Sequence, residues 1–430
     1  MERQYKDSGI PWMKQIPSDW SIIRGKNLLY LMNRPVREED DVVTCFRDGE
    51  VILRSERRTE GFTMSDKEIG YQGINKGDIV IHGMDGFAGS MGVSKSSGKG
   101  SPVLIVCNPK SEDDARYIIY YLRSLAMNNV FVALATGIRE RSCDLRWNKI
   151  SVLPFVRPSF GEQKKIADFI DMKSEEIDSL IGLQEQMIEK LKAYKQSVIT
   201  EAVTKGLNPN AKLVPSGIDW IGEIHEGVKL VKLSMVTSKI GSGSTPRGGS
   251  SIYVKEGIKF LRSQNVYCEG FDLSDVAYIT EAIDEEMSGT RVRIGDVLLN
   301  ITGGSIGRCY YVDETLGRAN VNQHVSIIRP TKIETKYLKY YLQSECGQLQ
   351  IALLQTGGNR EGLSAAALSQ FTIVYPLKEE QHAIASYLDE KCSEIDKLIL
   401  VKQKKIQKLK DYKKSIIYEA VTGKTDLRDN

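Results

Sequence analysis

Two stretches, beginning near residues 162 and 380, carry an apolar pattern that predicts long helices. Each continues for about forty residues without a proline, which corresponds to roughly 60 Å of helix at 1.5 Å per residue. Apolar positions, with Gln184 and Lys195 completing the series in the first stretch, recur at alternating spacings of four and three, the period of a coiled-coil seam. The seam positions are Ile177, Ile181, Ile188, Leu191 and Val198 in one stretch and Ile395, Ile399, Ile406, Leu409 and Ile416 in the other. We expect antiparallel pairing of the two helices within one chain; the alternatives are a homodimer seam and two separate solvent-bridging helices.

The stretches 21–115 and 229–335 follow a different pattern. Short β-branched and apolar runs alternate with Gly, Ser and Asn turns, which predicts small modules that are mixed or largely β. A shorter helix is expected after each module, at 116–128 and at 335–354. The predicted fold class is therefore α+β, with two modules, flanking helices and two long helices.

The chain contains an internal repeat. Ser8-Gly-Ile-Pro-Trp12 recurs as Ser216-Gly-Ile-Asp-Trp220, and 162–204 recurs at 380–422 with 23 of 43 positions identical. A tandem duplication with a pseudo-two-fold axis is the simplest explanation. The helical parts match closely and the modules do not, which favours a binder with two different surfaces over an enzyme with a single site. The predicted division is a first recognition module at 1–160, a central helix at 161–208, a second module at 209–378 and a C-terminal helix at 379–430.

Composition narrows the class of protein. The chain is 41% hydrophobic and 27% charged, which is ordinary for a globular protein. Its 59 Lys+Arg against 56 Asp+Glu give a net charge of +3, too balanced to indicate nucleic-acid binding from charge alone. No apolar run approaches the length of a membrane span, and the polar start of the chain does not resemble a leader, so we expect a cytoplasmic protein without a membrane span. The seven scattered cysteines predict reduced thiols.

The sequence carries none of the common catalytic motifs. The sequences around Gly98-Lys99 and Gly423-Lys424 lack the glycine spacing of a phosphate loop. The four histidines are far apart in the sequence, and no metal-ligand spacing is present. The run Asp284-Glu-Glu286 could be a set of metal ligands, but it is more typical of a solvated face or a helix start. The sequence therefore predicts no catalytic residue and no metal site in this chain.

The loops of both halves are rich in small, amide and basic residues that could read DNA. Asn, Gln and Arg can each make two hydrogen bonds to a base edge, although ordinary turn chemistry is the alternative for any one of them. In the first half the candidates are Arg54, Arg57, Arg58, His82, Lys95, Lys99, Arg139 and Arg141. In the second half they are Ser244, Thr245, Arg247, Arg262, Gln264, Asn265, Asn300, Thr302, Ser305, Arg308, Asn322, Gln323, His324, Asn359 and Arg360.

Taken together, these motifs closely resemble the specificity (S) subunit of a type I restriction-modification enzyme. The resemblance covers essentially the whole chain. It is carried by Tyr5-Lys-Asp-Ser-Gly-Ile-Pro-Trp12, its repeat Ser216-Gly-Ile-Asp-Trp220, Gly295-Asp-Val-Leu-Leu-Asn-Ile-Thr-Gly-Gly-Ser-Ile-Gly307 and Asn322-Gln-His324, together with the paired long helices.

The resemblance implies two target recognition domains that each read one half of a bipartite site in double-stranded DNA, with the helices setting the gap. It implies two methyltransferase subunits and additional restriction subunits as partners. S-adenosylmethionine, ATP and Mg²⁺ would then be bound by those partners and not by this chain. The first half has Gly83-Met-Asp-Gly86 where the second has a Thr-Gly-Gly-Ser loop. The resemblance therefore supports base contacts less strongly in the first half than in the second.

Two other functions would be compatible with parts of the pattern. A coiled-coil adaptor tethering two protein-binding modules would differ in lacking steeply salt-dependent binding to polyanions. A self-sufficient nuclease or methyltransferase would act on DNA with Mg²⁺ and S-adenosylmethionine alone, and the missing motifs argue against it.

Overall fold

A computed structural model describes residues 3–57, 69–134, 145–355 and 362–428. The chain divides into two compact units. Unit 1 comprises Met1–Glu185 and Lys404–Asn430, and unit 2 comprises Gln186–Gln403. Both long helices contribute residues to both units.

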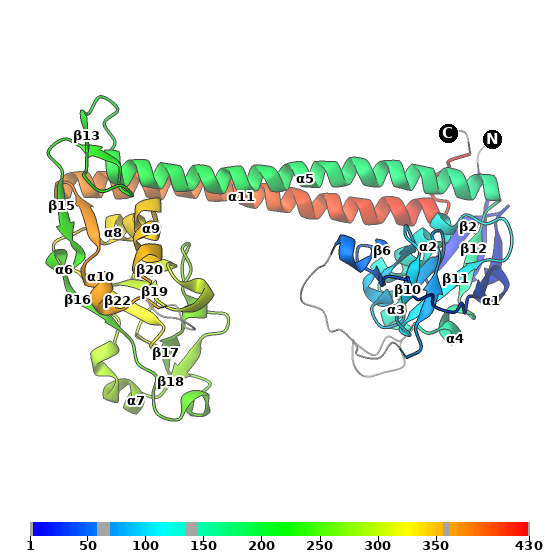
Figure 1. The fold of residues 1–430 in the computed structure, drawn as a ribbon, viewed down its shortest axis with the longest axis horizontal. Coiled ribbons are helices and arrows are strands. Elements are labelled where there is room, and N and C mark those ends of the chain that lie inside the picture. The colour runs from blue at the N-terminus through cyan, green and yellow to red at the C-terminus, as the bar shows by residue number, and fades with distance from the viewer. Residues whose placement is uncertain (1–2, 58–68, 135–144, 356–361, 429–430) are drawn as a thin grey trace. The chain divides into compact units, whose positions relative to one another are not determined.

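Unit 1 contains short strands, short helices and one longer helix. Its elements are β1 (Tyr5–Ile10), β2 (Met13–Pro17), β3 (Ser21–Arg24), α1 (Gly25–Leu28), β4 (Leu29–Leu31), β5 (Val43–Cys45), β6 (Val51–Leu53), β7 (Gln72–Ile74), β8 (Ile79–His82), β9 (Met91–Val93), β10 (Gly98–Gly100), β11 (Leu104–Pro109), α2 (Ala115–Met127), α3 (Val130–Ala133), α4 (Trp147–Ile150) and β12 (Pro154–Arg157) (Figure 1).

Unit 2 repeats this plan with additional strands. Its elements are β13 (Leu213–Pro215), β14 (Glu223–His225), β15 (Lys229–Lys232), α6 (Leu233–Val236), β16 (Thr237–Ser242), β17 (Ile258–Leu261), β18 (Ala277–Ile279), α7 (Glu281–Glu286), β19 (Val297–Asn300), β20 (Cys309–Tyr311), β21 (Ala319–Val321), β22 (Val325–Pro330), α8 (Thr335–Gln343), α9 (Glu345–Leu354), α10 (Ala365–Ser369) and β23 (Thr372–Tyr375). The long helices are α5 (Phe160–Lys205) and α11 (Lys378–Val421).

The same four-stranded antiparallel sheet lies at the centre of each unit. The strand order is β4-β11-β8-β9 in unit 1 and β16-β22-β19-β20 in unit 2. A buried aspartate directly precedes β8 in unit 1 and β19 in unit 2. Asp78 pairs with Arg34, and Asp296 pairs with Arg329 at 2.7 Å. The equivalent order and the equivalent buried carboxylate confirm the α+β fold expected from the duplication.

Tyrosines of α2 and α8 attach these helices to the strand that leads into each long helix. Tyr117 donates to the carbonyl of Val156 at 2.9 Å, and Tyr337 donates to the carbonyl of Val374 at 2.8 Å. Both rings are fully buried. The helix expected at 335–354 is in fact two helices. Ser344 interrupts it, because its hydroxyl accepts from the Gly347 amide and caps α9.

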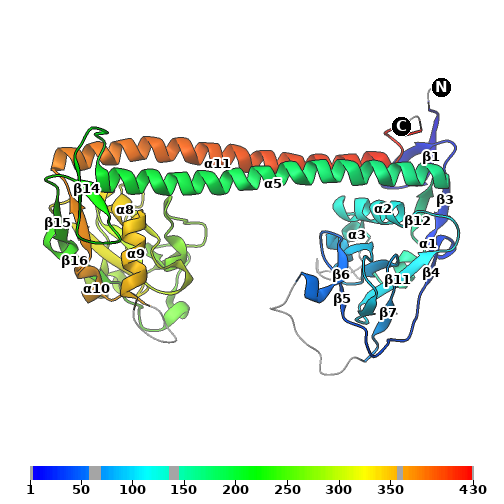
Figure 2. The ribbon, with the colours of Figure 1, turned by 45° about the horizontal axis from the view of Figure 1, so that its top comes forward.

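The long helices pack antiparallel within each unit (Figures 1 and 2). In unit 1 the carboxylate of Asp178 accepts from Lys413 at 2.7 Å, and in unit 2 the carboxylate of Asp396 accepts from Lys195 at 2.8 Å. Asp178 corresponds to Asp396, and Lys195 to Lys413, at the repeat offset of 218 residues. The two ion pairs are thus pseudo-symmetric copies of one contact.

The proposed seam residues lie along these packed faces. Ile177, Ile188, Val198 and Ile395 are buried, and the other seam residues, Ile181, Leu191, Ile399, Ile406, Leu409 and Ile416, are half-buried. A glycine with positive φ follows each helix, Gly206 at +74° and Gly423 at +70°, as expected where a helix ends in a left-handed residue. The sequence predicted helical segments at 161–208 and 379–430, whereas α5 spans Phe160–Lys205 and α11 spans Lys378–Val421. No helix in the described part of the chain is both long and apolar enough to span a bilayer.

Candidate nucleic-acid interface

Four loops meet at one end of the unit 2 module. They are 243–245 after β16, 262–265 after β17, 300–308 between β19 and β20, and 321–324 between β21 and β22. Main-chain hydrogen bonds connect them: the Asn322 amide donates to Leu261, and the Ile301 amide donates to His324, both at 3.0 Å. The structure therefore brings together candidate residues that lie up to eighty positions apart in the sequence.

Two of the candidate asparagines hold these loops in place. Asn300 is fully buried and its amide donates to the carbonyl of Ser263 at 2.7 Å. Asn265, also buried, accepts from the Arg262 amide and donates to the carbonyl of Asp272, both at 2.9 Å. The expectation of base contacts is corrected for these two, because their hydrogen-bonding groups face the protein interior. Asn322 is 9% exposed, and its side chain accepts from the His324 amide at 3.1 Å, so it also stabilises the conformation of its loop.

The remaining candidates of unit 2 that the structure describes are accessible. Ser244, Thr245, Arg247, Gln264 and Gln323 are exposed, and Arg262, Thr302, Ser305, Arg308 and His324 are half-buried. Thr302 Oγ1 lies 2.6 Å from His324 Nδ1, and Gln323 Nε2 lies 3.2 Å from His324 Nε2. Donors and acceptors from two loops thus converge, in an arrangement suited to base edges.

Two residues of this surface had no sequence signal. The guanidinium of Arg308 lies over the ring of Tyr267, 4.9 Å from its centroid. The carboxylate of Asp275 accepts a hydrogen bond from Gln264 at 2.7 Å and also contacts Arg262. Tyr267 and Asp275 lie in the long β17–β18 connection, where neither a motif nor a repeated counterpart marks them.

Unit 1 presents a different surface at the equivalent end of its sheet. His82 ends β8 where Asn300 ends β19, and its Nδ1 accepts from the Asp85 amide at 3.0 Å. Burial lowers the pKa of His82 below its ordinary value, which favours the neutral imidazole required by that hydrogen bond. Exposed Met84 occupies the place of Thr302. The two units therefore offer different chemistry on one scaffold.

Two exposed basic candidates of unit 1, Arg57 and Lys95, have carboxylate partners among the described residues. Arg57 binds Asp48 at 2.5 Å and Glu50 at 3.1 Å, and Lys95 binds Glu50 at 2.9 Å. Arg57 also lies over the ring of Phe46, 4.3 Å from its centroid. These carboxylates reduce the positive potential that Arg57 and Lys95 offer to phosphates, and both residues stay candidates for DNA binding.

The other unit 1 candidates fall into two groups. Arg54 donates to Thr44 Oγ1 at 3.2 Å, and Lys99 is half-buried on β10. Arg58, Arg139 and Arg141, like Asn359 and Arg360 of the second half, lie outside the described residues.

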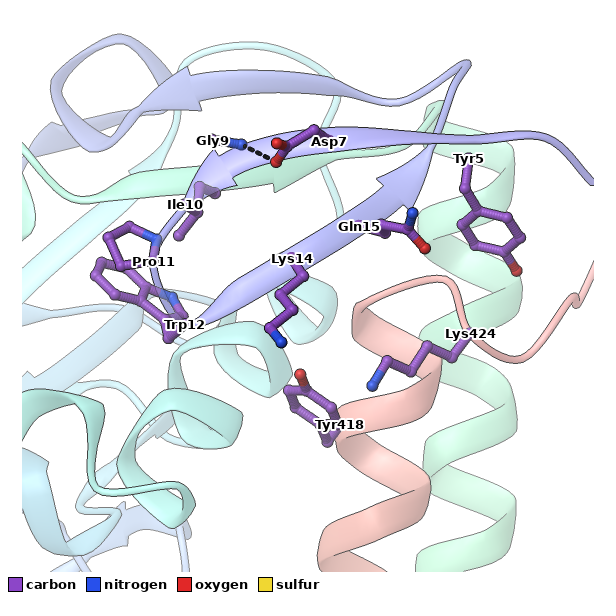
Figure 3. A pocket seen from close by; sticks show the side chains of 10 residues that line it. All are labelled: Tyr5, Asp7, Gly9, Ile10, Pro11, Trp12, Lys14, Gln15, Tyr418 and Lys424. Atoms are coloured by element: carbon purple, nitrogen blue, oxygen red, sulfur yellow. Dashed lines mark hydrogen bonds between the residues drawn. The ribbon is translucent and has the colours of Figure 1, made fainter.

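Each unit has a groove next to the end of a long helix. In unit 1, the β1–β2 hairpin and the end of α11 form a groove, in which Lys14 and Lys424 flank Tyr418 (Figure 3). Lys424 Nζ is 4.6 Å from the centroid of the Tyr418 ring. In unit 2, the end of α5 and residues 221–223 line a groove that includes Thr200, the counterpart of Tyr418. Each unit thus has a groove beside its copy of the Ser-Gly-Ile-x-Trp motif.

The described residues contain no group of three or more His, Cys, Asp or Glu arranged to hold a metal ion. Their cysteines, Cys45, Cys107, Cys268, Cys309, Cys346 and Cys392, are free thiols.

The known proteins similar to this chain share one description. Residues 226–411 match the type I restriction modification DNA specificity domain. The chain is 26% identical over 441 aligned residues to the MjaVIII specificity subunit of Methanocaldococcus jannaschii, covering 99% of this chain and 98% of the relative. It is 23% identical over 367 residues to the EcoBI specificity subunit of Escherichia coli, covering 80% and 73%.

The fold is also that of a solved structure. A chain from a structure describing complex assembly and conformational transition of the type I R-M system superposes with a TM-score of 0.70 at 16% identity, covering 95% of this chain and 99% of that chain. The matched domain and the full-length relatives make this chain similar to the specificity subunits of type I restriction-modification systems, and the solved structure shows the same fold.

Proposed function

We propose that each unit reads one half of a bipartite DNA site, within the sequence-specificity role of this family. The observation that carries the proposal is the pairing of one repeated sheet with two different loop surfaces. Unit 2 presents Thr302, His324 and Arg308 at the position where unit 1 presents His82 and Met84. Two unlike sets of base-facing groups on one scaffold are suited to two unlike half-sites.

The partners follow from the same duplication. Because each unit carries a copy of the Ser-Gly-Ile-x-Trp hairpin beside a helix end, the chain suits two copies of one partner, and we assign these two places to methyltransferase subunits. Restriction subunits would join the same complex. In this role the chain recognises DNA and is not itself an enzyme; S-adenosylmethionine, ATP and Mg²⁺ would be bound by the partners. Phosphate contacts from those partners would supplement the near-neutral charge of this chain.

The proposal is tested by mapping adenine methylation in cells that express the cognate methyltransferase subunit with and without this chain. A two-part motif with a fixed gap is expected only when the chain is present. Replacing residues 1–160 with the equivalent region of a relative should change one half of the motif and leave the other intact. A change in both halves, or in neither, would contradict the assignment of one half-site to each unit.

A second prediction concerns the helices. Inserting the same few residues into α5 near Ile188 and into α11 near Ile406 is expected to lengthen the gap and to leave both half-sites unchanged, because both helices continue from one unit into the other. The gap is read from the methylation motif of the variant complex. An unchanged gap in an active complex would remove the role of the helices as a ruler.

A further inference from the structure

The carboxylate of Asp275, between β17 and β18, binds two candidate base-reading side chains at once. Its Oδ2 accepts from Gln264 Nε2 at 2.7 Å and from Arg262 Nη2 at 3.3 Å. The main-chain carbonyl of Asp275 accepts from the same Nη2 at 2.5 Å. The Asp275 side chain is 82% exposed and that of Arg262 is 24% exposed. The three side chains therefore form a cluster at the protein surface.

The loop itself is held by other groups. The Asn265 side chain bonds the Arg262 amide and the Asp272 carbonyl, both at 2.9 Å. Val266 is fully buried in an apolar cluster beside this loop. Because none of these contacts uses the Asp275 carboxylate, its removal is expected to leave the loop folded.

The cluster adjoins the other loops of the interface. Ser263, which lies between Arg262 and Gln264 in the sequence, accepts from the buried amide of Asn300 at 2.7 Å. Leu261 accepts from the Asn322 amide at 3.0 Å. Arg262 and Gln264 are thus fixed to the same loops that carry Thr302 and His324.

We propose that Asp275 is a positioning residue that holds Arg262 and Gln264 together as one unit for reading purines in the half-site of unit 2. This rests on the proposed function. Arg262 Nη1 and Gln264 Oε1 make no hydrogen bond among the described residues and remain available. Arginine pairs bidentately with guanine, and glutamine with adenine. Both side chains are long and flexible, so fixing them before DNA arrives reduces the entropy lost on binding.

The test uses the full chain assembled with its methyltransferase subunit. Fluorescence anisotropy gives the affinity for a duplex with the mapped methylation motif and for one with the unit 2 half-site scrambled. Asp275→Ala is expected to lower the ratio of the two affinities by about tenfold, the scale of one bidentate base contact. Affinity for the scrambled duplex should stay the same or rise slightly, because a negative charge is lost near the phosphates. The methylation motif should relax only within the unit 2 half-site.

Asp272→Ala is the matched control. It removes the same charge from the same connection, but within the described part of the chain the Asp272 carboxylate accepts only from Ser274, so the affinity ratio should not change. The effects of Arg262→Ala and Asp275→Ala should be less than additive, whereas a merely structural role would make them additive.

The positioning role would be wrong if Asp275→Ala bound the cognate duplex more tightly, because the carboxylate would then hold Arg262 and Gln264 away from DNA. It would also be wrong if the affinity ratio did not change, or if sequence specificity were lost in the unit 1 half-site. If the wild-type complex shows no two-part motif at all, it is the proposed function that fails.

Discussion

Replacing Glu162 with glutamine is expected to destabilise unit 1 by about 3 kcal/mol, because the substitution breaks a buried ion pair. Glu162 Oε1 accepts from Arg3 Nη2 at 2.5 Å, and Glu162 Oε2 accepts from the indole of Trp20 at 2.8 Å. The Arg3 and Glu162 side chains are only 4% and 8% exposed. The variant keeps the shape of the side chain but leaves the Arg3 cation with the more distant carboxylates of Asp19 and Asp426.

The repeat supplies a matched control. Glu380 is the counterpart of Glu162 at the start of α11, and it forms no hydrogen bond or ion pair among the described residues. Urea unfolding should therefore show a large loss of stability for Glu162→Gln and little change for Glu380→Gln. Equal effects of the two substitutions would contradict the energetic role of the Arg3–Glu162 pair.

Replacing Lys339 with isoleucine is expected to stabilise unit 2 by about 2 kcal/mol at pH 7. Lys339 is 5% exposed, and burial lowers the pKa of its ammonium to about 8. Its Nζ lies 3.3 Å from the centroid of the Tyr340 ring, which offsets part of the burial penalty. The counterpart in unit 1 is the buried Ile119, so the scaffold already accommodates isoleucine at this position.

The pH dependence of the free energy of unfolding shows whether the buried ammonium causes the stability difference between the wild type and Lys339→Ile. Between the folded pKa of about 8 and the unfolded value of about 10.4, the unfolded chain holds a proton that the folded chain has lost. The wild type therefore recovers stability relative to Lys339→Ile as the pH rises, by about 1 kcal/mol between pH 7 and pH 9. The difference between the two proteins must be measured, because buried thiols oppose this trend in both. Burial raises the pKa of Cys45 to about 12 and that of Cys346 to about 11, so these thiols lower the stability of both proteins as the pH rises above about 8.5.

Urea unfolding of both proteins at pH 7 and pH 9 provides the measurement. Lys336→Met is the control, since Lys336 lies one turn earlier, is 39% exposed and pairs with Asp389 at 2.7 Å. Its loss should destabilise only slightly, with no change between the two pH values. A stability gap between wild type and Lys339→Ile that does not narrow with pH would show that the buried charge is not its source.

The repeat and the helices could be predicted from local pattern alone. A 3.5-residue period is set by neighbours within two turns, so the sequence predicted α5 and α11 and the seam positions along them. Strands β8 and β19 were equally readable, because each follows a Gly-Asp turn. The break at Ser344 was missed, since the helical pattern continues across it and only the serine cap on the Gly347 amide ends the first helix.

The candidate interface was only partly readable. Sequence composition identified the loops of unit 2 that carry Thr302, Arg308 and His324. It could not separate these from Asn265 and Asn300, because an amide looks the same in a sequence whether it faces solvent or the core. Asp275 and Tyr267 gave no signal, since their importance depends on the partners they meet and not on their neighbours in the chain.

By itself, the sequence determined the duplication, the α+β class, the two long helices and the resemblance to type I specificity subunits. These properties follow from periodicity and motif spacing, which residues close in the chain specify together. Only the tertiary structure decided which side chains face outward and which carboxylates bind them. The pair Arg3–Glu162 spans 159 residues, and the cluster of Arg262, Gln264 and Asp275 exists only because the β17–β18 connection folds back on itself. Such contacts are selected by packing between distant segments, and no local pattern encodes them.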